Sequence, residues 1–146
     1  ELQNGGEFVV LLFLAAWGND TLAYCTGMLI GKHKMSPILS PKKSIEGLIG
    51  GIVGAAILGG LYGMYLNTYI SFSINPVTMF PVICGLGGAV SVIGDLAASA
   101  IKRDSGIKDY GTLIPGHGGI LDRFDSIIFI APVIYYLTVM ISGGAI

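Results

Sequence analysis

The chain has 146 residues, of which 53% are hydrophobic and only 12% are charged, and its formal net charge is -1. A soluble domain carries about 25% charged residues, so this composition excludes an ordinary soluble domain and indicates a membrane protein. The net charge is uninformative, because the distribution of charges matters here and their total does not. Cys25 and Cys84 both lie in apolar segments, which predicts buried thiols and no disulfide framework.

Four segments are predicted to span a membrane, which takes roughly 20 mostly apolar residues per helix. In chain order they are Phe8 to Ile30, Ile45 to Leu66, Val77 to Ile101 and the shorter Ser126 to Ile141. The predicted fold is all-α, a polytopic transmembrane bundle of about four spans in a single membrane-embedded region, residues 1–146. The chain begins at Glu1 without a basic leader, which predicts no signal peptide and fits the C-terminal part of a longer protein with further N-terminal spans.

The basic residues fall in two places only, four between the first and second spans and four between the third and fourth. They are Lys32, Lys34, Lys42, Lys43, Lys102, Arg103, Lys108 and Arg123. The connection between the second and third spans, residues 67–76, carries no charge. Four spans place both basic connections on one side of the membrane, and the positive-inside rule predicts that this side is the cytoplasm.

The second span is rich in glycine at a spacing of four residues, in the pairs Gly47/Gly51, Gly50/Gly54 and Gly59/Gly63. Such pairs let helices approach closely in lipid, where no hydrophobic driving force acts between them. The sequence therefore predicts glycine-rich helix packing. Packing within one chain is the favoured interpretation, and a dimer face is the alternative.

Two carboxylates, Asp95 and Asp20, interrupt the apolar spans. Asp95 lies seven residues before Lys102, roughly 10 Å along a helix from the basic connection. A charge at that depth costs on the order of 3 kcal/mol, so it usually faces an ion, a wet cavity or a partner. A metal ligand is favoured for Asp95, against an ion pair with a loop lysine or a protonated acid. Asp20 either belongs to the same site or helps to pin helices by hydrogen bonds.

Two further aspartates lie at the start of the fourth span. Asp122 would meet Asp95 if the third and fourth spans pack antiparallel, and two such carboxylates can hold one or two Mg²⁺ ions. Asp125 is either a helix N-cap or a further ligand at the same site.

The stretch 99–125 holds four basic and four acidic residues, one histidine and five glycines. Lysine and arginine suit phosphate oxygens, carboxylates suit a divalent cation, and glycines let backbone N–H groups approach phosphates. Lys102 and Arg103 could instead be snorkelling anchors, but a lipid-headgroup patch would be basic throughout. The mixed charges favour a metal–nucleotide triphosphate site at a bilayer surface. His117 either binds phosphate, carries a proton or does neither.

Three groups of motifs within residues 17–126 carry a family resemblance. The longest reads S-x-x-K-R-x4-K-D-x-G-x3-P-G-H-G-G-x-x-D-R-x-D from Ser99 to Asp125. The second is Asn19-Asp20-Thr21-x-Ala23-Tyr24-x-x-Gly27 with Ser40-Pro41-Lys42-Lys43-Ser44-x-Glu46-Gly47, and the third is Gly94-Asp95-Leu96. Together they resemble the phosphatidate cytidylyltransferase (CDP-diacylglycerol synthase) family.

The resemblance implies an enzyme that transfers CMP from CTP to phosphatidic acid, giving CDP-diacylglycerol and pyrophosphate. It implies Mg²⁺, with two ions as one option, a homodimer in contact with membrane lipid, and no nucleic-acid partner. The expected location is a bacterial inner membrane or its equivalent, with the active site facing the cytoplasm. A related CTP-using membrane enzyme such as a polyprenol kinase, and a transporter or ion channel, are the alternatives.

The expected roles of the site residues fall into three groups. Metal ligands are Asp95, Asp122 and Asp125. Catalytic residues around the triphosphate are Lys102, Arg103, Lys108, Asp109 and Arg123. Substrate-binding residues are Ser40, Lys42, Lys43, Ser44, Ser99, Gly116, His117, Gly118 and Gly119.

Overall fold

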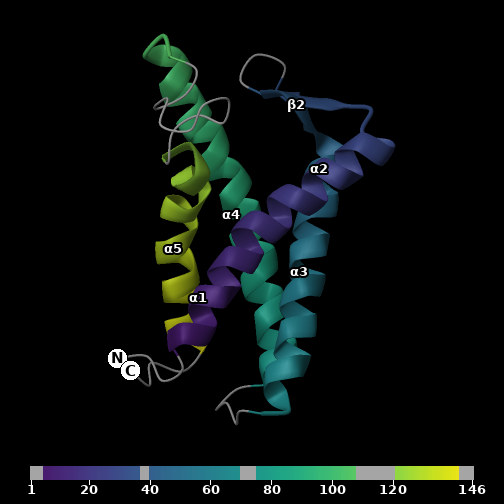
Figure 1. Ribbon diagram of the computed structural model, residues 1–146, viewed down its shortest axis with the longest axis vertical. Coiled ribbons are helices and arrows are strands. Elements are labelled where there is room, and N and C mark those ends of the chain that lie inside the picture. Colours follow the sequence, from purple (N-terminus) through teal and green to yellow (C-terminus); the bar gives the residue numbers. More distant parts are fainter. Residues whose placement is uncertain (1–4, 37–39, 70–74, 108–120, 142–146) are drawn as a thin grey trace.

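The computed structural model describes residues 5–36, 40–69, 75–107 and 121–141, with the side chains of 41, 42, 121–123 and 141 left out. The first rod joins helix α1 (Gly5–Phe13), one π-helical turn η1 (Leu14–Gly18) and helix α2 (Asn19–Ile30). A hairpin of β1 (Lys34–Ser36) and β2 (Ser40–Ser44) follows. Helices α3 (Ile45–Asn67), α4 (Pro76–Asp104) and α5 (Leu121–Ile141) complete the bundle (Figure 1).

The helices confirm the predicted all-α membrane bundle. Within the described residues, three helices are long and apolar enough to cross a membrane, over Gly6–Ile30, Ile45–Asn67 and Pro76–Asp104, and a shorter apolar helix covers Phe124–Met140. The fourth span nevertheless starts earlier than predicted, because α5 begins at Leu121. Asp125 therefore lies inside the helix, and its interpretation as the N-cap is wrong.

Side-chain caps fix where two of the helices begin. The Ser44 hydroxyl accepts a hydrogen bond from the Gly47 N–H at 3.1 Å and caps α3. The Asn75 side chain accepts from the Val77 N–H at 2.9 Å, and Pro76 occupies the first position of α4, where a missing N–H costs nothing. At the other end of α4, Gly106 has a φ of 69°, which ends the helix in a conformation that glycine tolerates best.

Glycines let α3 pack closely against two other helices. A Cβ on Gly51 would lie 2.7 Å from the Asn19 Oδ1 of α2, and one on Gly59 would lie 2.7 Å from the backbone oxygen of Phe80 in α4. All three predicted glycine pairs meet neighbours of this kind, which are Ala23, Thr26, Leu22, Asn19, Cys84 and Pro76. Packing within the chain is thus confirmed for these pairs, and a homodimer stays a prediction that they do not support.

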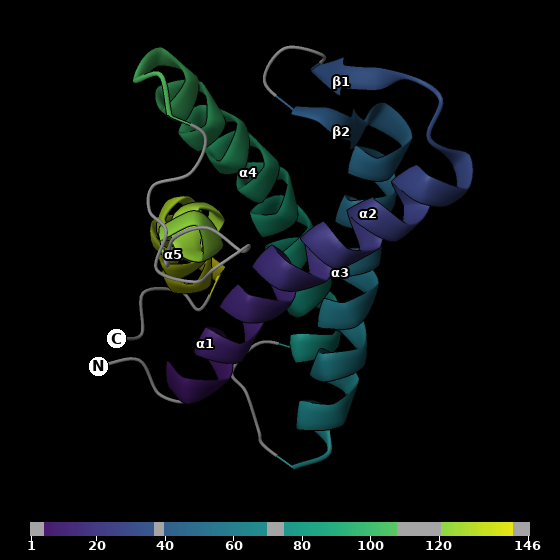
Figure 2. The ribbon, with the colours of Figure 1, turned by 45° about the horizontal axis from the view of Figure 1, so that its top comes forward.

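Helix α4 lies between α3 and α5, and the α1–η1–α2 rod crosses them (Figure 2). Buried apolar side chains of this rod, α3, α4 and α5 form one core, which includes Leu11, Ala15, Ala55, Phe80, Ile83, Cys84, Ile130 and Ile134. Both cysteines are free thiols, as predicted, but only Cys84 is buried, and the expected burial of Cys25 is wrong.

The hairpin and the C-terminal end of α4 lie at the same end of the bundle, which we call the basic end (Figure 1). The beginning of α1, the end of α3 and the beginning of α4 lie at the opposite, far end. Because Lys43 is in β2 and Lys102 is near the end of α4, the described parts of the two basic connections share one end, as predicted.

Candidate active site

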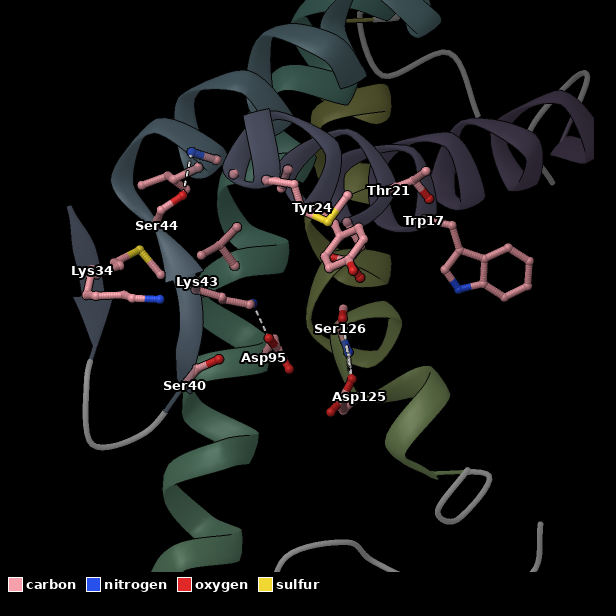
Figure 3. Close-up of a pocket in the computed structure, with 18 of the residues that line it drawn as sticks. Trp17, Thr21, Tyr24, Lys34, Ser40, Lys43, Ser44, Asp95, Asp125 and Ser126 are labelled. Carbon is pink, nitrogen blue, oxygen red and sulfur yellow. Dashed lines mark hydrogen bonds and ion pairs between the residues drawn. The ribbon is translucent and has the colours of Figure 1, made fainter. Parts of the chain in front are cut away.

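A cavity of about 1120 Å³ opens at the basic end, between α2, the hairpin, α3, α4 and α5 (Figure 3). Its polar lining includes Asp20, Lys34, Ser40, Lys43, Ser44, Asp95, Asp125 and Ser126. Its apolar lining includes Trp17, Tyr24, Met28, Val92 and Phe124. The cavity therefore presents cations, carboxylates and an apolar wall to the same volume.

Lys43 and Asp95 meet across the cavity. Strand β2 directs the Lys43 ammonium onto the Asp95 Oδ2 of α4, and these side chains are 27% and 25% exposed (Figure 3). The ion pair matches the alternative in which Asp95 pairs with a loop lysine. It engages one carboxylate oxygen, and the partial exposure of both groups leaves them within reach of a ligand.

Asp125 and Lys102 form a second, more deeply buried pair. The Lys102 Nζ lies 3.7 Å from the Asp125 Oδ2, and the two side chains are only 12% and 8% exposed. The other oxygen of Asp125 accepts a hydrogen bond from the Ser126 N–H at 2.8 Å. Lys102 therefore points into the protein, and the snorkelling alternative does not describe it. Its neighbour Arg103 is exposed and is not part of the cavity lining.

Asp20 brings a third carboxylate to the cavity, from α2. It lies near enough to Lys43, Asp95 and Asp125 to interact with all three electrostatically. The neighbouring Asn19 amide is fully buried where α3 and α4 carry Gly51 and Gly88, but among the described residues neither its nitrogen nor its oxygen has a hydrogen-bond partner, so a hydrogen-bonded pin between helices is not seen there. The sequence leaves the role of Asp20 undecided, although a polar pair inside an apolar span is the signal that points to the site.

The remaining predicted site residues lie partly inside and partly outside the described parts of the chain. Ser40 and Ser44 line the cavity from β2, and Ser99 is half-buried on α4 outside the lining. Lys42 lies in β2, and Asp122 and Arg123 lie in the first turn of α5, but their side chains are not described. Outside the described residues lie Lys108, Asp109, Gly116, His117, Gly118 and Gly119.

The predicted metal site shared by Asp95 and Asp122 stays a prediction, because the side chain of Asp122 is not described. Among the side chains that the structure describes, no three of histidine, cysteine, aspartate or glutamate lie close enough to share one ion. Asp95 instead pairs with Lys43 of β2, and Asp125 of α5 pairs with Lys102 of α4. A metal there would need water or phosphate oxygens as additional ligands.

Comparison with known proteins identifies the family. The sequence pattern of the cytidylyltransferase family matches residues 1–141. The chain is 37% identical over 139 residues to a phosphatidate cytidylyltransferase of Thermotoga maritima, covering 95% of this chain and 52% of the relative. Relatives of the same name from Synechocystis sp. and Staphylococcus aureus are 43% and 42% identical, over 90% and 94% of the chain and 43% and 51% of the relatives. The chain thus spans about half the length of the curated relatives it matches, and it belongs to the cytidylyltransferase family.

Proposed function

We propose that the full-length protein transfers CMP from CTP to phosphatidate, forming CDP-diacylglycerol and pyrophosphate. One observation carries the proposal: carboxylates of α2, α4 and α5 and a hairpin lysine line the same cavity at the basic end, next to an exposed apolar wall. The names of the relatives, phosphatidate cytidylyltransferases, give the same reaction.

The lipid phosphate is the nucleophile in this reaction. Its oxygen forms a bond to the α-phosphorus of CTP while the bond from that phosphorus to the α,β-bridging oxygen breaks and pyrophosphate leaves. Both reactants are anions, so the main barrier is their repulsion and their alignment. Such transfers depend on positioning and electrostatic stabilisation rather than on a covalent enzyme group. Lys43 supplies positive charge in the described lining of the cavity, and Lys102, which is outside that lining, pairs with Asp125, which is part of it.

The donor set of the cavity fits Mg²⁺. This ion is usually bound by one or two carboxylates together with water and substrate phosphates. Asp95 and Asp125 face the cavity from neighbouring helices and would hold it, with Asp122 as a further predicted ligand. When bound, Mg²⁺ would neutralise charge on the triphosphate. One or two ions are compatible with this arrangement.

The apolar wall is suited to a lipid substrate. Trp17, Tyr24 and Met28 line the cavity but are 50%, 62% and 67% exposed. Acyl chains stay in the bilayer because each buried CH₂ is worth about 0.8 kcal/mol. We therefore propose that phosphatidate enters sideways past this wall while CTP enters from the water at the basic end.

The reaction is tested with purified full-length protein, phosphatidate and CTP labelled in the α-phosphate. We expect label in a CMP-bearing lipid and release of one pyrophosphate per product. Phosphorylated lipid together with labelled CDP would instead identify a kinase. Movement of a solute without CTP consumption would identify a transporter.

The cytoplasmic orientation of the basic end is a separate part of the proposal. Single cysteines at Ser40 and Ser105 are both expected to react with an impermeant thiol reagent from the cytoplasmic face of sealed vesicles. Ser40 lies in β2, and Ser105 follows α4 and is exposed. Reaction of the two positions from opposite faces would contradict a shared nucleotide site.

A further inference from the structure

The base of the β1–β2 hairpin is tied to α3 by two residues that do not line the cavity, His33 and Glu46. The backbone N–H of His33 donates to both Glu46 carboxylate oxygens, at 3.3 and 3.2 Å. The His33 ring Nδ1 lies 2.6 Å from the Glu46 Oε1, and a carboxylate can only accept, so this nitrogen donates. The Ile45 N–H donates to the His33 carbonyl at 2.9 Å. We call this group of contacts the clamp.

The hairpin needs such an anchor because it is very short. In the described residues its strands pair at Lys34 with Ser44 and at Ser36 with Ser40, with an irregularity between the two pairs. An isolated two-stranded hairpin is at best marginally stable in water. Ser44 is also the N-cap of α3, so β2 enters the helix directly and the clamp acts where strand and helix join.

Lys43 is the residue next to that junction. The direction in which β2 leaves α3 therefore decides whether the Lys43 ammonium reaches Asp95, which belongs to a different helix. We propose that Glu46 is a positioning residue: through His33 it fixes the hairpin on α3 and thereby holds Lys43 over Asp95 in the cavity. The consequence for turnover rests on the proposed function, whereas the position of the hairpin does not.

A general stabilising role of Glu46 predicts different behaviour. An acid in the first turn of a helix interacts favourably with the helix dipole, and loss of its charge alone would remove that benefit. Glu46→Gln removes the charge but keeps an oxygen that can accept from His33. Glu46→Ala removes every clamp contact except the bond from Ile45 to the His33 carbonyl. The Ser44 cap and the glycine packing of α3 remain in both variants, so the bundle is expected to fold.

Hairpin position can be measured without any activity assay. Spin labels are placed at Ser36 of β1 and at Ile101, which is 53% exposed on α4, in full-length protein whose other cysteines have been replaced. We expect Glu46→Ala to broaden the distribution of distances between the labels and Glu46→Gln to preserve it. Glu7→Ala is the matched control, because it removes a carboxylate that joins two helices at the far end. An unchanged distribution in Glu46→Ala would overturn the proposal.

Kinetics then show whether Glu46 acts through Lys43. A misplacement of about 1 Å can cost as much as 10²-fold in rate, and we expect Glu46→Ala to lower kcat by about tenfold or more, with Glu46→Gln recovering most of the loss. In a Lys43→Ala background, Glu46→Ala is expected to have little additional effect on kcat. Fully additive losses would show that Glu46 does not act through Lys43. If the parent protein transfers no CMP, the proposed function fails, and the label distances still decide the clamp.

Discussion

The two ends of the bundle use similar polar groups for different purposes. At the far end, the Tyr62 hydroxyl of α3 donates to the Glu7 carboxylate of α1, while the Tyr62 ring stacks on Phe80 with centroids 5.9 Å apart. The Phe8 ring packs edge-on against Phe80, with centroids 6.2 Å apart. At the basic end, the carboxylates of Asp95 and Asp125 pair with lysines at the wall of a cavity.

This difference shows that the surroundings of a charged pair indicate its role better than the pair itself. The hydrogen bond from Tyr62 to Glu7 joins α1 to α3 beside the packed rings of Tyr62, Phe80 and Phe8. Asp95 meets its partner beside open volume, so ligand oxygens or a cation can compete for the same groups. Substitutions at the basic end should therefore change catalysis, and substitutions at the far end should change stability alone.

The largest effect on stability is expected for Lys102→Met. The change leaves the Asp125 carboxylate buried without this partner, and breaking a buried ion pair typically costs about 3–5 kcal/mol. Thermal unfolding in detergent measures the loss. Lys102→Met combined with Asp125→Asn should regain stability without regaining activity, whereas Arg103→Met, at an exposed neighbour, should unfold like the parent. Equal losses in the single and double variants would mean that the pair does not hold α4 to α5.

Asp95→Asn is expected to have the next largest effect, this time on turnover. Loss of one electrostatic group that acts on the reacting centre typically lowers kcat by about 10²–10³-fold. The asparagine keeps the size of the side chain, so the fold should be retained. The measurement is the rate at which labelled CDP-diacylglycerol forms. Glu7→Gln, at the far end, is the control and should have nearly normal activity. If the Asp95→Asn enzyme kept the kcat of the parent, Asp95 would not be part of the active site.

Gly59→Ala should be clearly destabilising, because its Cβ would lie 2.7 Å from the backbone oxygen of Phe80. Overpacking of this kind costs typically about 1–3 kcal/mol. Gly60→Ala is the neighbouring control, since its Cβ would meet only the Pro81 Cγ, at 3.3 Å. Denaturation of both variants in the same detergent gives the difference. If Gly60→Ala were the more damaging of the two, the close approach of α3 to α4 at Gly59 would be contradicted.

The smallest effect is expected for Tyr62→Phe. It removes the hydroxyl that donates to Glu7 but keeps the ring stacked on Phe80. The net loss of one hydrogen bond is worth about 0.5–1.5 kcal/mol. The midpoint of thermal unfolding should fall slightly while kcat and the KM for CTP stay unchanged. A large change in kcat would contradict the division of roles between the two ends.

The sequence predicted the bundle well because lipid restricts the possible structures. Uninterrupted apolar segments must form helices there, and glycines spaced by four residues must pack closely. The hairpin could not be foreseen. Its strands are short and contain Pro41, and they lack the alternation of apolar and polar residues that marks a half-buried strand.

The sequence predicted which types of residue form the candidate site, but not which side chains pair with one another. No register between the hairpin and α4 follows from the sequence, so a metal and a lysine were both possible partners of Asp95. Asp20 was left undecided because helical periodicity alone does not say which neighbour covers each face. The structure supplies both answers for the described residues: Lys43 contacts Asp95, and Asp20 lines the cavity.

The π-helical turn η1 sets the rotational phase of the first rod. A π-turn closes its hydrogen bond over one more residue than an α-turn, and one residue corresponds to about 100° of helix rotation. Asn19 and Asp20 follow this turn directly, and they face the core and the cavity respectively. A continuous α-helix over the same five residues would also be apolar and able to span the membrane, yet it would rotate Asp20 by about 100° relative to its present position and turn it away from the cavity. The wider turn of this segment is therefore as much a part of the site as the carboxylate that it orients.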